Sequence, residues 1–430
     1  MFIHLDLDCF FVSAHRTLDN SLKNIPVAVG GRSNLNIFSS QKEVRKISQN
    51  SGAFVSTILT NEGNKTFKDY FVDENGKIRG IITTSSYEAR GFGVKTAMSV
   101  NEALRLCPSL KMIPPNYPLY HELSQKLFKL LEEEIPLVEQ FSIDEFFADL
   151  RGYVKEEDIV AFAYKIKNRI EKELKLPISI GIAHSKYLAK LITEYAKPDG
   201  IKYIKKEHMQ SFIKDIPIEK FPGIGKGYQQ RLKGYGIKTL GDIKEKKNLF
   251  YSWKKPGIEL YNRVCGINDT KIVQQRDKKS IGMGRSFDPI YDRDELIRRV
   301  LILSRYLCFI VKKSEVNPLT YAIKIKYESN LKSKNYINVN RIFNESDFKA
   351  TMKKLFIQND THASHGVIQL NLTVSNFSNE KEFTYNIFEY ENDLKKRELS
   401  NKLQYLRNKY GIDIIKTASE LKDKLSTKML

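Results

Sequence analysis

Two acidic groups in short apolar stretches of this sequence could hold a divalent cation. Asp6 and Asp8 lie in HLDLDCFF near the N-terminus, and Asp144 and Glu145 lie in SIDEFF. Carboxylates in an apolar setting are costly unless they are paired or bound to a metal. Hard oxygen donors from Asp6, Asp144 and Glu145 would suit Mg²⁺, which binds a few carboxylates together with substrate phosphates.

The local geometry of each group sets a condition on such a site. Side chains alternate along a strand, so Asp6 and Asp8 share one face with His4. A half-buried edge strand with a wet acidic face would show the same alternation. Asp144 and Glu145 are consecutive, so a regular strand would point them to opposite faces. Sharing one ion therefore requires a tight turn there, and the cation would relieve the repulsion between the carboxylates.

The composition indicates a multidomain protein with a polyanionic partner. At 430 residues the chain is too long for one core, and 41% hydrophobic with 28% charged residues is typical of a soluble globular protein. Its 71 Lys and Arg against 51 Asp and Glu give a formal charge of +20. Such a charge bears on partners, and nucleic acid is the obvious one because basic groups gain from counterion release.

Neither a membrane protein nor a secreted one is predicted. No apolar run approaches the length needed to cross a bilayer, and an acidic strand stands where a signal peptide needs a basic patch. The four cysteines, Cys9, Cys107, Cys265 and Cys308, lie far apart with no C-x-x-C pairing. We therefore expect reduced thiols in a cytoplasmic protein.

The element pattern predicts an α+β sheet domain first. FIHLDLD and IPVAVGG read as strands, and 157–176 has the apolar spacing of an amphipathic helix. YEARGFGV begins as a helix that breaks at Gly91 and Gly93, and PISIGIAHSKYLAK is a strand running into a helix. This mixed order suits a sheet with helices packed on one face.

The remainder of the chain differs in character from this first part. Between Lys205 and Ser280 there are eighteen Lys and Arg against eight Asp and Glu, with short helices broken by Gly and Pro. Strands and helices follow to about Tyr390, and the last forty residues look helical and charged with no clear core of their own. The polar stretch 33–77 lacks periodicity and is predicted to be a long insertion or a mobile loop.

Five motifs in order, DLDCFF, YEARGFGV, SIDE, AKPDGI and FPGIGKG, resemble those of the Y-family DNA polymerases that copy damaged templates, and most of all the bacterial polymerase IV branch. The resemblance covers Met1 to about Glu420. It implies an α+β right-hand polymerase with a ferredoxin-like palm, small fingers, a helical helix-hairpin-helix thumb and an α+β little finger. The implied bounds are palm 1–10 and 114–204, fingers 11–113 with an insertion at about 41–77, thumb 205–279, little finger 280–390 and a helical tail 391–430.

The resemblance also implies the reaction and its metal. The chain would add deoxynucleotides from dNTPs to a primer 3′ end on a DNA template, using two Mg²⁺ ions, with Mn²⁺ as an alternative. Asp6 and Asp144 match the metal-binding aspartates, the Leu7 carbonyl matches the main-chain ligand, and Glu145 matches the third, catalytic carboxylate. Asp8 has no metal role in the family pattern and is left as a supporting residue.

The nucleotide pocket follows from the same comparison. Phe11 matches the steric gate, an aromatic ring that leaves no room for a 2′ hydroxyl, while Phe10 beside it is better explained by core packing. Tyr87 and Arg90 are three residues apart on one helix face and match residues that hold the triphosphate. Thr84 and Lys197 complete this implied set. For Arg90 alone, a plain surface charge is the alternative.

The DNA-holding parts are implied by two further segments. FPGIGKG predicts a helix-hairpin-helix in which Gly223, Gly225 and Lys226 approach the DNA backbone, although a plain helical hairpin would look similar. KKSIGMGRSF matches the entrance to the little finger and adds the phosphate-contact candidates Lys278, Lys279 and Arg285. Such contacts predict an affinity for primer-template DNA that falls steeply with salt.

A sliding clamp is the other implied partner, for a protein otherwise expected to be monomeric. TYNIFEYEND lies where relatives carry a clamp-docking peptide, with Ile387 and Phe388 as its anchors. Thr384 replaces the usual leading Gln, which puts the clamp affinity in doubt.

Two other functions share some of these features. A catalytically inactive family member could act as a scaffold in a mutagenesis complex, but the intact Asp6, Asp144, Glu145, Arg90 and Lys197 argue against it. A nucleotidyl cyclase uses a similar palm and two aspartates, yet would not need the hairpin motif or the basic C-terminal half.

Overall fold

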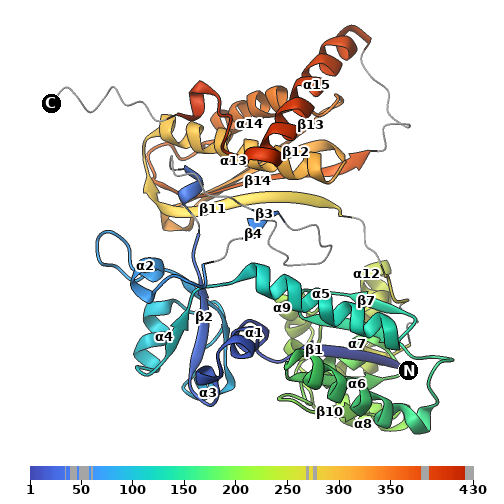
Figure 1. The fold of residues 1–430 in the computed structure, drawn as a ribbon. Helices are drawn as coiled ribbons and strands as arrows, with labels where there is room; N and C mark the ends of the chain where they lie inside the picture. Colours follow the sequence, from blue (N-terminus) through green and yellow to red (C-terminus); the bar gives the residue numbers. More distant parts are fainter. Residues whose placement is uncertain are drawn as a thin grey trace. The chain divides into compact units, whose positions relative to one another are not determined.

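The computed structural model describes residues 1–33, 35–38, 46–47, 58–59, 62–267, 271–274, 278–378 and 387–421. The chain divides into two units (Figure 1). The first contains Met1–Gly31 and Thr60–Arg276, together with Asn50–Ser56. The second contains Asp277–Leu430 together with Arg32–Gln49 and Thr57–Leu59. Each unit is described by itself below.

A five-stranded sheet in the order β10-β9-β1-β8-β7 forms the palm of the first unit. Its strands are β1 (Phe2–Leu7), β7 (Val138–Gln140), β8 (Glu145–Asp149), β9 (Ile178–Ala183) and β10 (Ile201–Tyr203). Helices α5 (Tyr117–Glu134) and α6 (Ile159–Leu174) pack on one face of the sheet with Ile3, Leu5 and Leu7. All six residues of β1 are buried at the centre, so the edge-strand alternative is wrong. The expected ferredoxin-like palm is confirmed in this mixed sheet, in which β10 pairs with β9 in parallel and the other pairs are antiparallel.

The fingers are a smaller subdomain of the same unit. Their sheet has the order β5-β2-β6, from β2 (Val27–Gly31), β5 (Ile81–Ser85) and β6 (Lys111–Ile113). Their helices are α1 (Phe10–Leu18), α2 (Phe67–Phe71), α3 (Tyr87–Gly91) and α4 (Val100–Leu106). Cys9 adopts a left-handed conformation with φ 47° just before α1, which turns the chain sharply from the palm strand into this helix.

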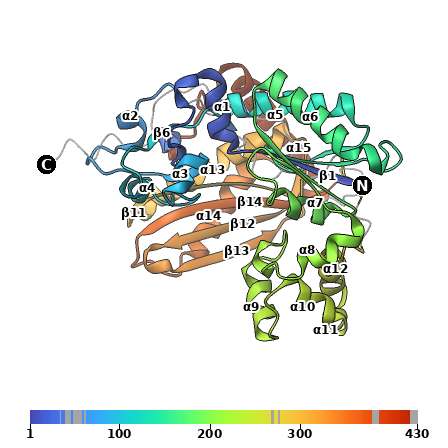
Figure 2. The same cartoon turned by 90° about the horizontal axis from the view of Figure 1, so that it is seen from below.

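Short helices form the thumb (Figure 2). They are α8 (Met209–Ile213), α9 (Lys226–Gly234), α10 (Leu240–Glu245), α11 (Lys247–Ser252) and α12 (Lys254–Cys265). Gly223 has φ +98°, a left-handed conformation that favours glycine, and Gly225 is the N-cap of α9. Their core is continuous with that of α7 (Lys186–Thr193), the palm helix that follows β9.

The second unit contains the little finger. Figure 2 shows its antiparallel sheet in the order β11-β14-β12-β13. The strands are β11 (Ser280–Ile290), β12 (Asn317–Tyr327), β13 (Lys332–Asn338) and β14 (Val367–Ser378), and the helices are α13 (Arg293–Lys313), α14 (Glu345–Asn359) and α15 (Ile387–Tyr410). None of the helices in the described part of the chain combines the length and apolar character needed to cross a membrane.

The stretch 33–77 is not the single fingers loop that its polarity suggested. Its later part forms α2, whose Tyr70 and Phe71 are buried in the core of the fingers. Its beginning forms the short helix η2 (Asn36–Phe38) and belongs to the second unit, as do the strands β3 (Lys46–Ile47) and β4 (Ile58–Leu59). The expected insertion at about 41–77 therefore divides between two units.

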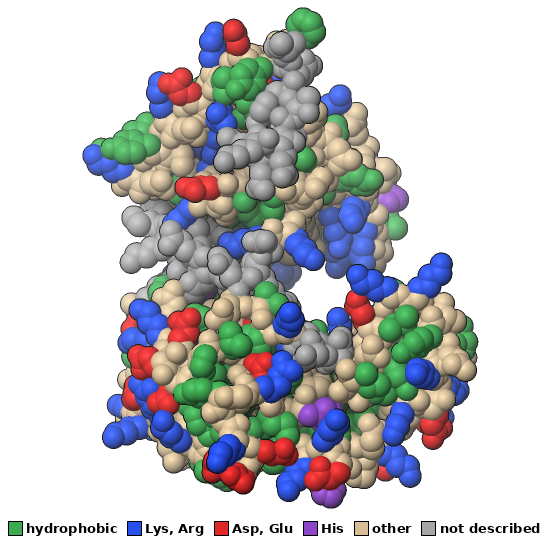
Figure 3. All heavy atoms as spheres, turned by 90° about the vertical axis from the view of Figure 1, so that its right-hand side faces the viewer, with side chains coloured by type: hydrophobic (Ala, Val, Ile, Leu, Met, Phe, Trp, Pro, Cys, Tyr) green, Lys and Arg blue, Asp and Glu red, His purple; other side chains and the backbone are tan. Residues whose placement is uncertain are grey.

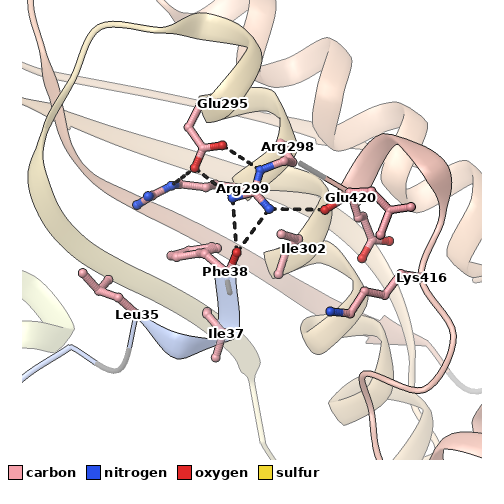
Figure 4. A pocket seen from close by; sticks show the side chains of 10 residues that line it. Leu35, Ile37, Phe38, Glu295, Arg298, Arg299, Ile302, Lys416 and Glu420 are labelled. Carbon is pink, nitrogen blue, oxygen red and sulfur yellow. Dashed lines mark hydrogen bonds and ion pairs between the residues drawn. The ribbon is translucent and has the colours of Figure 1, made fainter. Parts of the chain in front are cut away.

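Phe38 anchors the start of this segment to α13 (Figure 4). The ring is 8% exposed and joins the little-finger core, with the Arg299 guanidinium 4.5 Å from its centroid. Arg298 donates to the Phe38 carbonyl oxygen at 3.3 Å, and Glu295 pairs with both arginines. A hydrophobic side chain inside a polar stretch is thus a core residue of the second unit.

The C-terminal segment contributes to the little-finger core, in agreement with the expectation that it has no core of its own. The side chains of Arg305 and Glu420 are fully buried and 2.6 Å apart, and Lys349 pairs with the same carboxylate. Arg305 also donates to the Ile412 carbonyl oxygen at 2.9 Å, and Ile412 lies in the little-finger core. The Glu420 carboxylate therefore lies inside the little finger, where its ion pairs offset the cost of burying its charge.

Candidate functional site

The acidic residues of the two motifs lie side by side in the palm sheet. Antiparallel pairing of β1 with β8 places Asp6 opposite Glu145. The Leu7 amide donates to the Asp144 carbonyl oxygen at 3.0 Å, so the pairing continues into the turn before β8. Residues far apart in the sequence thus meet at the end of the central strand.

Ser142 shapes the turn that presents both carboxylates. Its hydroxyl donates to Asp144 Oδ1 at 2.6 Å and accepts the Glu145 amide at 3.1 Å. Asp144 lies in this turn, whereas Glu145 is the first residue of β8. The tight turn that the sequence required is present, and Ser142, to which the sequence analysis gave no role, holds it in place.

Without a bound cation, the negative charges of Asp6, Asp144 and Glu145 disfavour one another's ionised forms. Burial, together with the nearby Asp144 and Glu145 charges, raises the pKa of Asp6 to about 8 despite the opposing charge of Lys197. Burial also raises the pKa of Asp144, and the Glu145 charge adds to that rise. Negative charge gathered in a poorly solvated place favours binding of cations.

Two lysines supply cationic partners in this structure. Lys197 Nζ donates to Asp6 Oδ2 at 2.9 Å, and Lys190 Nζ pairs with Glu145 Oε1. Burial alone would lower the Lys197 pKa, but the charge of Asp6 and the bond to Glu194 outweigh it and raise the pKa. Lys190 was not identified from the sequence as a partner of the acidic cluster. The only signal for it was its position seven residues before Lys197 in the same segment.

His4 lies beneath this cluster, on the α7 side of the sheet. It is fully buried, its Nδ1 is 2.8 Å from Thr193 Oγ1, and its Nε2 is 3.8 Å from Glu145 Oε1. Burial, reinforced by the charge of Lys190, holds the His4 pKa well below its usual range. A neutral imidazole therefore backs the Glu145 carboxylate.

The donor set fits divalent cations. Asp6, Asp144 and Glu145 offer hard oxygens, the donors that Mg²⁺ prefers, and their pKa values show the need for positive charge. Among the residues that the structure describes, no three His, Cys, Asp or Glu side chains are close enough for a ready-made metal site. In this structure Glu145 and Asp6 are instead paired with Lys190 and Lys197.

The raised Asp6 pKa predicts a pH dependence of stability in metal-free protein. The folded pKa of about 8 lies above the ordinary aspartate pKa of 3.8, so the folded state binds a proton more tightly than the unfolded state. The associated stability is fully present below the unfolded pKa and is lost as the pH rises through the folded one, by up to about 6 kcal/mol.

Chemical unfolding in a chelator at several pH values measures this dependence. Asp6→Asn should flatten the stability profile, and added Mg²⁺ should restore stability at the alkaline end, because cation binding favours the ionised carboxylates. Identical pH slopes in the wild type and Asp6→Asn would refute the assignment of this titration to Asp6.

Phe11 is held rigidly in the first turn of α1. Its ring stacks on Tyr120 with centroids 4.2 Å apart and planes at 10°, and it meets the edge of Tyr117 at 6.3 Å. Tyr120 is fully buried, with its hydroxyl 2.8 Å from His15 Nε2. Phe10, in contrast, is 2% exposed within the palm core, which matches core packing and not a substrate contact.

The expected triphosphate residues come from three elements. Tyr87 and Arg90 lie on α3, where the Arg90 guanidinium carbon is 4.7 Å from the Tyr87 ring centroid. Thr84 is on β5, opposite Val29. Lys197 follows α7 and reaches Asp6, which brings one expected phosphate ligand to the acidic cluster.

The candidate DNA contacts are distributed over both units. In the first unit, Lys226 is the exposed first residue of α9, directly after the Gly223–Gly225 turn. In the second, Lys278 and Lys279 are exposed ahead of β11, and Arg285 lies within that strand. Figure 3 shows many Lys and Arg side chains on the face that it displays.

The proposed clamp peptide coincides with the start of α15. Ile387 is the first residue of this helix, and Phe388 is 93% exposed, the most exposed large hydrophobic residue in the described part of the chain. Thr384 lies outside the described residues.

Family models match most of the chain. The impB/mucB/samB family matches residues 5–194, the helix-hairpin-helix motif of this family matches 206–237, and its C-terminal domain matches 278–386. These matches run in the order of the palm and fingers, the thumb and the little finger.

Curated relatives extend over nearly the whole length. The chain is 30% identical over 400 residues to DNA polymerase IV of Clostridioides difficile, covering 90% of this chain and 96% of the relative. It is 31% identical over 422 residues to DNA polymerase IV of Oceanobacillus iheyensis, covering 96% and 90%. It is 28% identical over 430 residues to DNA polymerase IV 1 of Bacillus subtilis, covering 97% and 92%.

Solved structures share the fold at low sequence identity. A Y-family DNA polymerase chimera of Dbh and Dpo4 has a TM-score of 0.69 at 22% identity, covering 87% of this chain and 98% of the chimera. DinB from Sulfolobus solfataricus has a TM-score of 0.53 at 21% identity, with the same coverage. The chain therefore belongs to the Y-family DNA polymerases of the impB/mucB/samB type, in the DNA polymerase IV branch.

Proposed function

We propose that this chain extends a DNA primer on damaged templates by metal-dependent nucleotidyl transfer at Asp6, Asp144 and Glu145. It is a DNA-directed DNA polymerase of the translesion class, which follows from the family, and it acts on primer-template DNA and dNTPs. The assignment of the site residues, the choice of Mg²⁺ and the other partners are our proposals. One observation carries the site: β1 and β8 place Asp6 opposite Glu145, beside Asp144.

The side chains divide the work of the reaction. Asp6, Asp144, Glu145 and the Leu7 carbonyl would hold the metal ions, whose chemistry when bound would be to neutralise charge on the attacking 3′ oxygen and the leaving pyrophosphate. Lys197 and Arg90 neutralise the triphosphate, and Thr84 and Tyr87 support it. Lys190 and Lys197 must release Glu145 and Asp6 for the carboxylates to converge, so their ion pairs set a cost for assembling the site.

Primer extension tests this function directly. Purified protein is incubated with dNTPs and a labelled primer on an undamaged template and on a template with an abasic site, with Mg²⁺, with Mn²⁺ or with a chelator. We expect extension on both templates with either metal and none in the chelator. Extension that persists in the chelator would contradict the metal assignment.

The basic surface supports binding to the DNA backbone without sequence preference. The +20 charge, the Gly223–Gly225 turn with Lys226, and the exposed Lys278 and Lys279 are suited to phosphate contacts. We infer that Arg285 adds a contact from β11. Affinity for primer-template should therefore fall steeply with salt.

A sliding clamp is the further partner that we propose. Phe388 is 93% exposed, and an exposed aromatic side chain is a typical anchor for a partner pocket. Phe388→Ala should reduce capture of the protein by the cognate clamp by about tenfold or more. Tyr405→Ala, at a 66% exposed site on the same helix, is the matched control and should leave capture unchanged. Equal capture of all three proteins would exclude docking through Phe388.

Other parts of the proposal concern the protein as a whole. We propose that the protein is a monomer and that it acts in the cytoplasm. The four cysteines, which are free thiols in the structure, support the location. The domain bounds given above remain predictions, apart from the correction at 33–77.

Neither alternative function is favoured. The scaffold role would not need paired lysines around intact carboxylates, and the cyclase would not need a thumb that matches the family's helix-hairpin-helix motif. Failure of extension under every metal condition would reopen the scaffold hypothesis.

A further inference from the structure

Asp8 is the acidic residue of the first motif that the proposed chemistry leaves without a role. It lies one residue beyond β1, is 3% exposed, and its backbone amide donates to the Pro177 carbonyl oxygen at 3.0 Å. A buried carboxylate is costly unless donors surround it, so its partners indicate what it does.

Three donors from three separate segments converge on this carboxylate. Tyr87 Oη donates to Asp8 Oδ1 at 2.8 Å. Ser179 Oγ and the Asp199 backbone amide both donate to Asp8 Oδ2, each at 2.7 Å. Both oxygens are satisfied by the protein, so Asp8 contacts neither substrate nor metal in this arrangement.

These contacts link two groups that we assign to the triphosphate. Tyr87 begins α3 in the fingers and has the Arg90 guanidinium over its ring. Asp199 lies two residues after Lys197, in a turn where Asp199 has φ +52°. The position of this turn determines the position of the Lys197 backbone. The position of the Tyr87 ring determines where the Arg90 guanidinium can stack.

The Tyr87 hydroxyl has a single proton, which limits it to one hydrogen-bond acceptor at a time. A phenol has one proton to donate, and in this structure it goes to Asp8. A triphosphate at neutral pH offers acceptors only, so the Tyr87 hydroxyl cannot donate to it while bound to Asp8. Burial, followed by the Asp8 charge, raises the pKa of Tyr87, so the phenol keeps its proton.

We propose that Asp8 is a positioning residue that holds Tyr87 and the turn bearing Lys197, and through them sets Arg90 and Lys197 toward the dNTP triphosphate. This inference rests on the proposed triphosphate contacts. Asp8 acts through groups from the fingers and the palm at once, and in this structure the Tyr87 hydroxyl donates to Asp8.

Two measurements test the proposal. Steady-state kinetics of single-nucleotide insertion gives the KM and kcat for the dNTP, and equilibrium binding of the dNTP to a complex with a dideoxy-terminated primer gives its Kd. Asp8→Ala should raise the dNTP KM and the dNTP Kd by roughly 10- to 100-fold while changing kcat and primer-template affinity much less. Asp8→Asn should stay near wild type, because its oxygen can accept from Ser179 and Asp199 while its amide donates to the Tyr87 oxygen. Ser179→Ala is the matched control that removes one donor from the same carboxylate without releasing Tyr87.

A double-mutant cycle separates this role from a direct contact. If the Tyr87 hydroxyl serves Asp8, Tyr87→Phe added to Asp8→Ala should raise the KM no further. A double effect equal to the product of the single effects would overturn the proposal, as would a wild-type KM in Asp8→Ala. Equal losses in Asp8→Ala and Asp8→Asn would overturn it as well. An inactive wild-type protein would instead refute the proposed function, and dNTP binding to the terminated complex would still report on Asp8.

Discussion

Replacement of Asp144 by alanine should reduce nucleotide incorporation by at least about a thousandfold, because it removes a charged ligand at the place where charge develops in the reaction. Primer-template affinity should change little, since the candidate backbone contacts lie in the thumb and the little finger. The fold should also tolerate the change. Burial raises the pKa of Asp144, which means that its charge costs stability in the metal-free protein.

Single-turnover extension and equilibrium DNA binding measure the two quantities separately. Glu145→Ala should behave like Asp144→Ala, although it also releases Lys190. Glu132→Ala, an exposed carboxylate on α5, is the matched control and should extend primers as the wild type does. Near wild-type extension by Asp144→Ala would refute the site assignment, whatever the DNA affinity.

Replacement of Phe11 by alanine should admit ribonucleotides, lowering the preference for dNTP over rNTP by roughly a hundredfold. Exclusion by a clash works only if the ring cannot move away from the added hydroxyl. The stack on Tyr120 at 4.2 Å and the hydroxyl contact of Tyr120 to His15 give Phe11 that rigidity. The same support predicts that Tyr120→Leu weakens the selectivity in part.

The ratio of kcat/KM for matched dNTP and rNTP pairs gives the selectivity. Phe10→Leu provides the control, because Phe10 is its neighbour in sequence but packs in the palm core. This variant should lower the thermal stability and keep the sugar preference. Unchanged discrimination in Phe11→Ala would exclude the gate.

Much of the site could be predicted from the sequence, because short segments encode it. HLDLDC places a buried strand and its carboxylates, SIDE requires a turn, and both features are present in β1 and at Ser142. YEARG follows the N-cap Ser86 and ends at Gly91, so α3 and its Tyr87–Arg90 face follow from local preferences.

Other parts depended on residues far apart in the sequence. The ion pairs of Lys190 with Glu145 and of Lys197 with Asp6 arise only when α7 packs on the sheet. Asp8 gains its partners from α3, β9 and the turn after α7, which no local pattern brings together.

The sequence by itself determined the acidic motifs, the paired phenylalanines, the hairpin turn and the basic character, because each depends on a few consecutive side chains or on the net charge. Only the tertiary structure decided that Phe38, in a polar stretch, and Glu420, in a charged tail, are buried parts of the little finger. Burial of a lone ring or a charged group depends on partners such as Arg299 and Arg305, and those partners are set by packing over long separations in the chain.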